Sequence, residues 1–332
     1  MTRTSSPATR RPPFDPDLVS ALENLTATEP RVSAETLALK RRRYADAQAS
    51  GAALDLTAGG AVTVHELDVP GPDGAPDVHL TVLRPSGGSL PLPAIYYMHG
   101  GGMVLGDRYA GIDTLVPHAA DGSAVVVSVE YRLAPEYPYP TQVDDCYAGL
   151  VWVARNAQEL GADPDRIIVM GVSAGAGLAA GIALLARDRG FPALTHQVLL
   201  RPMLDDRMQT HSSQMLDGEG VWDRNENAFG WAAYLGGQGE ASPYAAPARA
   251  ADLTGLPRTY LDTGSADTFR DETLEYAGRL SAHGVSVDLH VWGGGFHGFE
   301  NQVPDAAVSR IARAVQDEFL RRALTRTDET KG

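Results

Sequence analysis

The chain has 332 residues, of which 43% are hydrophobic and 21% are charged. This composition is typical of a globular protein, and the length suits either one α/β core with insertions or two domains. The net charge of -14 argues against nucleic-acid binding, which needs a basic face. Cys146 is the only cysteine, which excludes an intrachain disulfide and fits a reducing compartment.

Two further features bear on location. The longest apolar run, 178–186, is too short to span a bilayer, so we expect no stable membrane insertion. The first residues are basic and Pro-rich, and no apolar segment typical of a secretory signal follows them. The sequence therefore predicts a cytoplasmic protein.

The N-terminal region, 15–55, is predicted to be helical. Residues 1–14 are rich in Ser, Thr, Pro and Arg and are expected to form a disordered tail. Asp15-Pro16 is typical of a helix start, and leucines recur after it at helical spacing. A second helix is predicted over 33–49. Both helices precede every predicted strand, so they must pack on the sheet domain or cover something on it.

Strands and helices alternate through most of the remaining chain. Segments 62–67 and 78–83 alternate apolar with polar residues around a turn and predict an antiparallel pair. Further strands are predicted at 94–98, 124–131, 166–170, 197–203, 258–262 and 286–292, with helices at 140–156, 174–188, 270–283 and 306–324. Nearly continuous apolar strands that alternate with helices indicate a mostly parallel α/β sheet covered on both faces. We assign 56–204 and 248–325 to this core.

Residues 205–247 interrupt the alternation and form a long, partly polar insertion between two core strands. An insertion of this length between core strands usually carries function. It contains a helix-like piece with the aromatic residues Trp222, Phe229 and Trp231. These rings fill a small subdomain or form the wall of a pocket, and the filling role is favoured for any one of them.

Ser173 lies in a G-x-S-x-G motif, GVSAG at 171–175, between a predicted strand and a predicted helix. An abrupt turn from strand to helix strains the backbone of its central residue, and only small residues two positions away avoid a clash. The turn would expose the serine hydroxyl at a helix N-terminus, where N–H groups favour negative charge. The alternative is a tight turn whose serine caps the helix.

Three other strand ends carry unusual residues, and sites in α/β sheets form at the carboxyl ends of strands. HGGG at 99–102 follows one strand and offers backbone N–H groups for an oxyanion hole. Asp267 follows the strand at 258–262, and His297 follows the last strand. The order Ser, Asp, His is that of an α/β-hydrolase triad. Asp262 and Asp271 are alternatives for the acid, but one lies within a strand and the other starts a helix.

These blocks resemble the hormone-sensitive lipase family of α/β-hydrolases, which includes bacterial esterases. The match comprises HGGG at 99–102, YRLAPEYPYP at 131–140, GVSAGAG at 171–177, DTFRDE at 267–272 and FHGF at 296–299. The resemblance extends over 92–319. It implies an eight-stranded sheet with a cap built from the N-terminal helices and the insertion.

The resemblance also implies roles for individual residues. Ser173 would be the nucleophile, Asp267 the acid and His297 the base. The oxyanion donors would be the N–H groups of Gly101, Gly102 and Ala174. His99 would orient the glycine loop, and Tyr131, Arg132, Pro135 and Glu136 would brace a neighbouring loop. Val172 departs from the Asp, Thr or Gly usual in similar members, which bears on specificity rather than on the attack itself.

The function predicted is hydrolysis of short- to medium-chain or small apolar carboxylic esters through an acyl-enzyme. Lactone hydrolysis by the same mechanism is the alternative, and a noncatalytic small-molecule receptor is a weaker one because receptors of this type have lost the histidine. The predicted pocket is apolar and comprises Met103, Val104, Leu105, Met203, Leu204, Trp222 and Phe296. No metal-ligand spacing or phosphate-binding loop is present, so no metal or cofactor is expected. The last predicted strand, at 286–292, can pair along its edge with the same strand of a second copy, so a homodimer is one option for the oligomeric state.

Overall fold

The computed structural model describes residues 10–50, 54–72, 74–89, 91–237 and 239–325. Its centre is one eight-stranded sheet with the order β1-β2-β4-β3-β5-β6-β7-β8. The strands are β1 (Val62–Val69), β2 (Val78–Pro85), β3 (Leu92–Met98), β4 (Val125–Glu130), β5 (Ala162–Val172), β6 (His196–Leu200), β7 (Arg258–Gly264) and β8 (Val287–Trp292). The predicted α/β fold and its mostly parallel sheet are confirmed.

The first two strands are antiparallel, as the alternating pattern predicted. In β1 and β2, Val62 pairs with Pro85 and Val69 with Val78. β2 also runs antiparallel to β4, whereas all pairings from β4 to β8 are parallel. The central strands β3, β4, β6 and β7 are buried along almost their whole length, and β5 is buried from Ile167 to Gly171, because helices cover both faces of the sheet.

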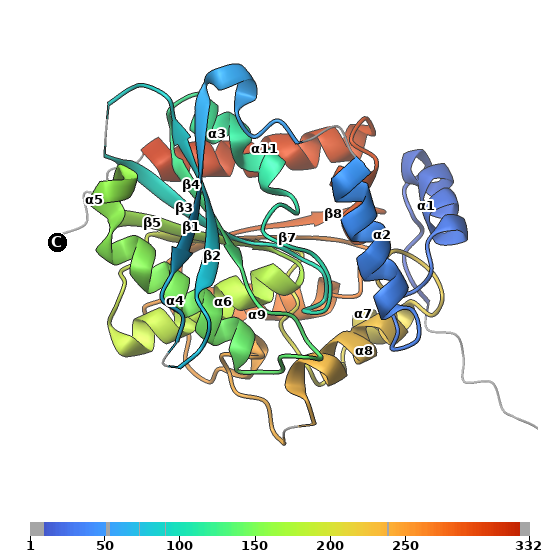
Figure 1. Cartoon of the computed structure of the whole chain (residues 1–332). Coiled ribbons are helices and arrows are strands. Elements are labelled where there is room, and N and C mark those ends of the chain that lie inside the picture. Colours follow the sequence, from blue (N-terminus) through green and yellow to red (C-terminus); the bar gives the residue numbers. More distant parts are fainter. Residues whose placement is uncertain (1–9, 51–53, 73, 90, 238, 326–332) are drawn as a thin grey trace, which may run out of the picture.

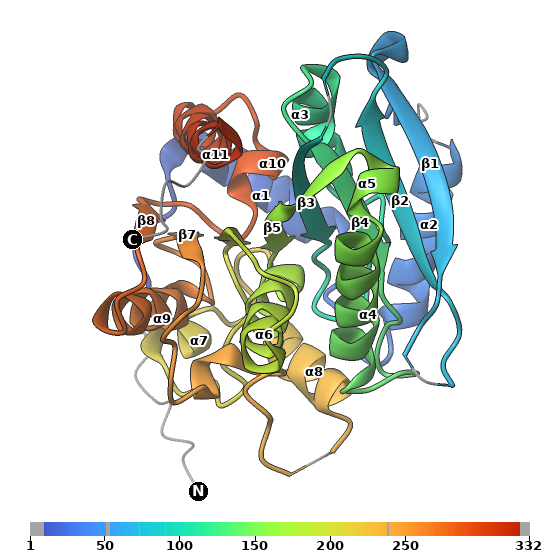
Figure 2. The same cartoon turned by 90° about the vertical axis from the view of Figure 1, so that its left-hand side faces the viewer.

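Figures 1 and 2 show α3 and α11 on one face of the sheet and α4, α6 and α9 on the other. These helices are α3 (Val116–Ala120), α4 (Thr141–Arg155), α6 (Ala174–Arg189), α9 (Arg270–Ala282) and α11 (Ala307–Thr325). The longer ones match the predicted segments within about two residues. The short helix α3 was not predicted, because five residues hold too little periodicity to recognise.

Four helices gather beyond the carboxyl ends of the parallel strands, on the right of Figure 1. They are α1 (Pro16–Thr28), α2 (Leu37–Ser50), α7 (His211–Met215) and α8 (Arg224–Leu235). α1 begins as predicted, since the Asp15 carboxylate accepts a hydrogen bond from the Asp17 N–H at 2.9 Å. Asp223 and Glu226 form a capping box at the start of α8.

The prediction of a disordered tail over residues 1–14 is wrong for the C-terminal end of that segment, which makes defined contacts. Residues 1–9 lie outside the described residues. Arg11 forms an ion pair with Glu219 at 2.5 Å, and its guanidinium lies over the Phe14 ring. Phe14 packs edge-to-face on Phe296. Composition alone missed this because the contacts that order the segment come from residues more than 200 positions away.

The N-terminal helix is fixed to the loop that follows β8. The Asp15 N–H donates to the Gly294 carbonyl at 3.0 Å, and a side chain at Gly294 would collide with Asp15. Leu18 and Leu22 of α1 are buried in a cluster with Phe296 and Phe299. α1 therefore supports the segment that carries His297.

Candidate active site

Ser173 is the single residue between β5 and α6. Its backbone has φ 58° and ψ -118°, a strained conformation for a residue with a side chain. The two glycines of the motif permit it, since a Cβ at Gly171 would lie 2.1 Å from the Gly175 carbonyl oxygen. A Cβ at Gly175 would lie 2.2 Å from the Met98 carbonyl oxygen. Only glycine fits at both positions. The close backbone packing that these glycines allow keeps Ser173 in its strained conformation at the start of α6.

A chain of two hydrogen bonds connects Ser173, His297 and Asp267. The distance from His297 Nε2 to Ser173 Oγ is 2.9 Å, and that from His297 Nδ1 to Asp267 Oδ2 is also 2.9 Å. The exposed fraction is 6% for Ser173, 9% for His297 and 0% for Asp267. Because a carboxylate only accepts, Nδ1 carries the proton and Nε2 can accept from the serine hydroxyl.

The two alternative acids have other partners. Asp262 is buried inside β7 and accepts from the Gln316 amide at 2.6 Å and from the Trp292 indole at 3.3 Å. Asp271 accepts from the Ser212 N–H and from the Arg270 guanidinium, both at 2.7 Å. Asp267 is thus the carboxylate that the structure brings to His297.

The glycine loop after β3 lies directly beside Ser173. A Cβ at Gly100 would be 3.3 Å from Ser173 Cβ, and Gly101 and Gly102 have φ of 119° and 62°. Within the described residues, the N–H groups of Gly101, Gly102 and Ala174 donate to no protein acceptor. Free N–H groups next to a nucleophile are suited to hold a developing oxyanion.

His99 is fully buried beneath this loop, as its expected orienting role requires. Its Nδ1 donates to the Gly100 carbonyl at 2.7 Å, and its ring stacks on Tyr131 with centroids 4.2 Å apart. The Tyr131 hydroxyl donates to the His99 carbonyl at 2.8 Å. On the neighbouring loop, Arg132 binds Asp145 through two hydrogen bonds of 2.6 and 2.9 Å. These contacts fix the backbone that presents the glycines.

Burial lowers the pKa of His99, which gives a testable pH dependence. The folded protein then holds the neutral ring, whereas the unfolded chain protonates it below about pH 6.5. Stability should therefore fall as pH drops below that value. We expect His99→Gln, which keeps an N–H donor, to reduce this loss by up to about 1.4 kcal/mol per pH unit. Urea unfolding at pH 7 and pH 5 measures it, and equal losses in both proteins would contradict it.

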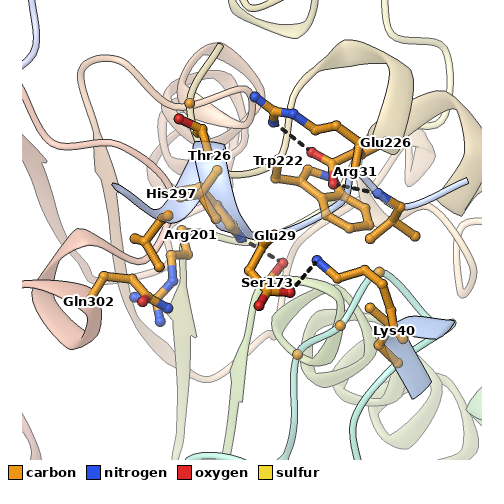
Figure 3. Close-up of a pocket in the computed structure, with 18 of the residues that line it drawn as sticks. Thr26, Glu29, Arg31, Lys40, Ser173, Arg201, Trp222, Glu226, His297 and Gln302 are labelled. Carbon is orange, nitrogen blue, oxygen red and sulfur yellow. Dashed lines mark hydrogen bonds and ion pairs between the residues drawn. The ribbon is translucent and has the colours of Figure 1, made fainter. Parts of the chain in front are cut away.

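A cavity of about 380 Å³ opens above Ser173. Figure 3 shows Ser173 and His297 on its floor and Trp222 beside them. α1 contributes Leu25 and Thr26, and the segments that follow contribute further lining residues, Glu29, Arg31, Val32 and Lys40. Two ion pairs lie at its wall, Lys40 with Glu29 at 3.9 Å and Arg31 with Glu226 at 3.0 Å. The N-terminal helices and the insertion thus both contribute residues to the wall of the cavity that contains Ser173.

The structure differs from the predicted pocket at five positions. Leu105 and Trp222 line the cavity as expected. The other five residues are fully buried in the hydrophobic core and do not line it: Met103, Val104, Met203, Leu204 and Phe296. Residues just past a strand end turn inward or outward according to their backbone angles, and the hydrophobic pattern of the sequence does not determine these angles. The lining is also more charged than predicted.

Sequence reasoning missed Arg201, which lines the cavity next to His297 in Figure 3. The predicted strand 197–203 included it, but β6 ends at Leu200 and Arg201 has φ 42°. Pro202, which has no N–H for a strand ladder, was the available signal. The Arg201 side chain is 6% exposed and forms an ion pair with Glu300. A charged residue thus lies where an apolar wall was expected.

The described residues contain neither a candidate metal site nor a membrane-spanning helix. No group of three or more His, Cys, Asp or Glu side chains in these parts of the chain is arranged to hold a metal ion. None of the helices in the described ranges has the length and apolar character required to cross a membrane.

The sheet order, the strained serine turn and the Ser-His-Asp arrangement define an α/β-hydrolase with a serine site. A family model for the alpha/beta hydrolase fold matches residues 95–301, and the chain belongs to this family. The predicted membership of the hormone-sensitive lipase group is confirmed.

Relatives and solved structures agree with this assignment over nearly the whole chain. Carboxylesterase NlhH of Mycobacterium tuberculosis is 36% identical over 96% of this chain and 99% of its own length. The structure of a bacterial heroin esterase is 42% identical, with a TM-score of 0.87 over 94% of this chain and 98% of that one. Esterase LipW of Mycobacterium marinum is 35% identical, with a TM-score of 0.85 over 96% and 99%.

Proposed function

We propose that this protein is a serine carboxylesterase that hydrolyses small esters through an acyl-enzyme on Ser173. The observation that carries the proposal is the hydrogen-bonded chain from Ser173 through His297 to Asp267, with both distances at 2.9 Å. The names of the relatives, which include a carboxylesterase and several esterases, support ester hydrolysis over other chemistry of this fold.

In the proposed mechanism, Ser173 Oγ attacks the ester carbonyl carbon while His297 Nε2 takes its proton. The N–H groups of Gly101, Gly102 and Ala174 hold the oxyanion of the tetrahedral intermediate. His297 then donates its proton to the leaving alcohol oxygen, and the acyl group stays on Ser173. Water attacks the acyl-enzyme in the same way and releases the acid. Asp267 keeps the His297 tautomer and stabilises the charged ring.

The size of the cavity supports short- to medium-chain acyl groups. A volume of about 380 Å³ is at the small end of ligand sites, and the Trp222 ring occupies part of the space beside Gly102. We therefore expect turnover to be highest with compact acyl groups.

The test is hydrolysis of p-nitrophenyl esters from acetate to palmitate, together with labelling by a fluorophosphonate. We expect rates to fall beyond medium chains and the label to attach to Ser173, as located by mass spectrometry. Absence of turnover with every ester and of labelling at Ser173, in folded protein, would contradict the proposal. Labelling without ester turnover would favour a specialised substrate such as a lactone.

The cytoplasmic location and the homodimer stay predictions. For the dimer, Leu289 and Val291 on the edge strand β8 are exposed at 36% and 41%, which gives an apolar edge available for pairing.

A further inference from the structure

The helix α2 is attached to the loop that follows the oxyanion glycines. The attachment is the side chain of Arg41, whose Nε donates to the Val104 carbonyl at 2.9 Å. Its Nη2 donates to the Ala134 carbonyl at 2.7 Å. The same guanidinium binds both carboxylate oxygens of Glu136, at 2.8 and 3.0 Å. Arg41 therefore connects a helix that lies beyond the strand ends (Figure 1) to the loops that follow β3 and β4.

The Val104 carbonyl matters because of the peptide unit to which it belongs. That unit also contains the N–H of Leu105, which donates to the Gly101 carbonyl at 2.9 Å. The Gly101 carbonyl in turn shares its peptide unit with the N–H of Gly102. In a planar trans peptide unit, the C=O and N–H bonds point in opposite directions. Two peptide units are therefore connected head to tail, from the Arg41 guanidinium to the N–H of Gly102.

The loop that contains these groups requires support from outside. Three successive residues, Gly101, Gly102 and Met103, have positive φ, of 119°, 62° and 66°. Met103 has a side chain, and such a residue keeps a left-handed conformation only where its surroundings hold it there. Its carbonyl accepts from the Ala134 N–H at 2.9 Å, and Arg41 holds the carbonyl of the next residue. Loss of Arg41 would release one of these two anchors.

The N–H of Gly101 is held in a different way. Its peptide unit contains the Gly100 carbonyl, which accepts from His99 Nδ1 at 2.7 Å. His99 is held neutral by its burial, whereas the guanidinium of Arg41 is always charged. The two loop N–H groups thus have separate supports, and the charged one stands behind Gly102. Removal of Arg41 would weaken one oxyanion donor and leave the support of the other in place.

We propose that Arg41 is a positioning residue, which orients and polarises the Gly102 N–H through the two peptide units that connect them. This inference rests on the proposed function. Attack by Ser173 Oγ on the ester carbonyl carbon moves the C=O π electrons onto the carbonyl oxygen, which becomes an oxyanion. A donor aimed at that oxygen binds it more strongly than it binds the neutral ester, and a charged group at one end of a hydrogen-bond chain strengthens the bonds that follow. The contribution of Arg41 therefore appears in kcat and not in KM.

Substitution of Arg41 by two different residues separates this role from a structural one. Arg41→Lys keeps the ion pair with Glu136, because charge-assisted bonds are the stronger ones, but a single ammonium lacks the planar fork that also reaches the Val104 carbonyl. Arg41→Ala removes both contacts. We expect kcat for p-nitrophenyl acetate to fall about tenfold in each variant, less than for loss of a whole oxyanion donor. KM should stay within about twofold of wild type. The melting temperature should fall mainly in Arg41→Ala.

Arg43→Ala is the matched control on the same helix. Arg43 contacts the Thr28 carbonyl at 3.3 Å and Glu29 at 3.6 Å rather than the oxyanion loop. Its loss should leave kcat unchanged. The second measurement is the inhibition constant of a trifluoromethyl ketone, which adds to Ser173 and places a negatively charged oxygen in the oxyanion hole. We expect this constant to rise about tenfold in both Arg41 variants and to stay at the wild-type value in Arg43→Ala.

Three results would overturn the proposal. They are wild-type kcat in folded Arg41→Lys, a change confined to KM, and a loss of kcat without a matching loss of affinity for the ketone. Arg41→Lys retains the ion pair between helix and loop, so it decides the question even where Arg41→Ala does not fold. Failure of the wild-type protein both to cleave any ester and to bind the ketone would instead reject the proposed function itself.

Discussion

Ser173→Ala is expected to lower kcat for p-nitrophenyl acetate by about 10⁵- to 10⁶-fold. The variant loses the nucleophile, so no acyl-enzyme can form, and the oxyanion N–H groups alone leave only a small residual acceleration. The change should not disturb the fold, because alanine differs from serine only by the loss of one hydroxyl group at this buried position, which is 6% exposed. Steady-state kinetics of purified protein measure the loss, and the labelling at Ser173 should disappear with it.

A buried serine elsewhere serves as the control. Ser212 is 0% exposed, donates to the Thr268 carbonyl at 3.0 Å and takes no part in the hydrogen bonds that join Ser173, His297 and Asp267. Ser212→Ala should lower the melting temperature but keep turnover within a few-fold of wild type. Because triad residues act as a unit, Ser173→Ala combined with His297→Ala should be no slower than Ser173→Ala alone. A folded Ser173→Ala protein with near-normal kcat would disprove the assignment.

The meeting of Ser173, Asp267 and His297 could be predicted because each of them follows a strand whose apolar run is visible in the sequence. Ser173, Asp267 and His297 come after β5, β7 and β8, and parallel strands place their carboxyl ends at one edge of the sheet. Strand order did not have to be known for this argument. The acid still required a choice among three carboxylates, and the contact between Asp267 and His297 is the observation that supports that choice.

The walls of the cavity could not be predicted in the same way. Met103 and Arg201 both follow strands closely and both have positive φ, yet Met103 turns into the core while Arg201 reaches the cavity. Residues of α1, such as Leu25, arrive from a segment with no strand to place it. Such contacts depend on how distant elements pack together, and hydrophobic periodicity reports only which face of an element is buried.

Asp267→Asn is expected to lower kcat about 10⁴-fold while the protein stays folded. The cause lies in the two partners of the carboxylate. Asp267 Oδ1 accepts from the buried Phe269 N–H at 2.9 Å, and Oδ2 accepts from His297 Nδ1 at 2.9 Å. An asparagine can satisfy Phe269 only with its oxygen, so its NH₂ group must face His297. Nδ1 then becomes the acceptor, the proton moves to Nε2, and His297 can no longer accept from Ser173.

Asp271→Asn is the matched control, since it makes the same chemical change four residues away on a carboxylate that binds Ser212 and Arg270. It should keep kcat within a few-fold of wild type, and any loss should appear in the melting temperature. The opposite order of the two variants would mean that the acid was assigned wrongly. Asp267 is fully buried, so water has little room to take the place of its carboxylate in the variant. Near-normal kcat in Asp267→Asn would therefore mean that His297 needs no carboxylate to fix its tautomer.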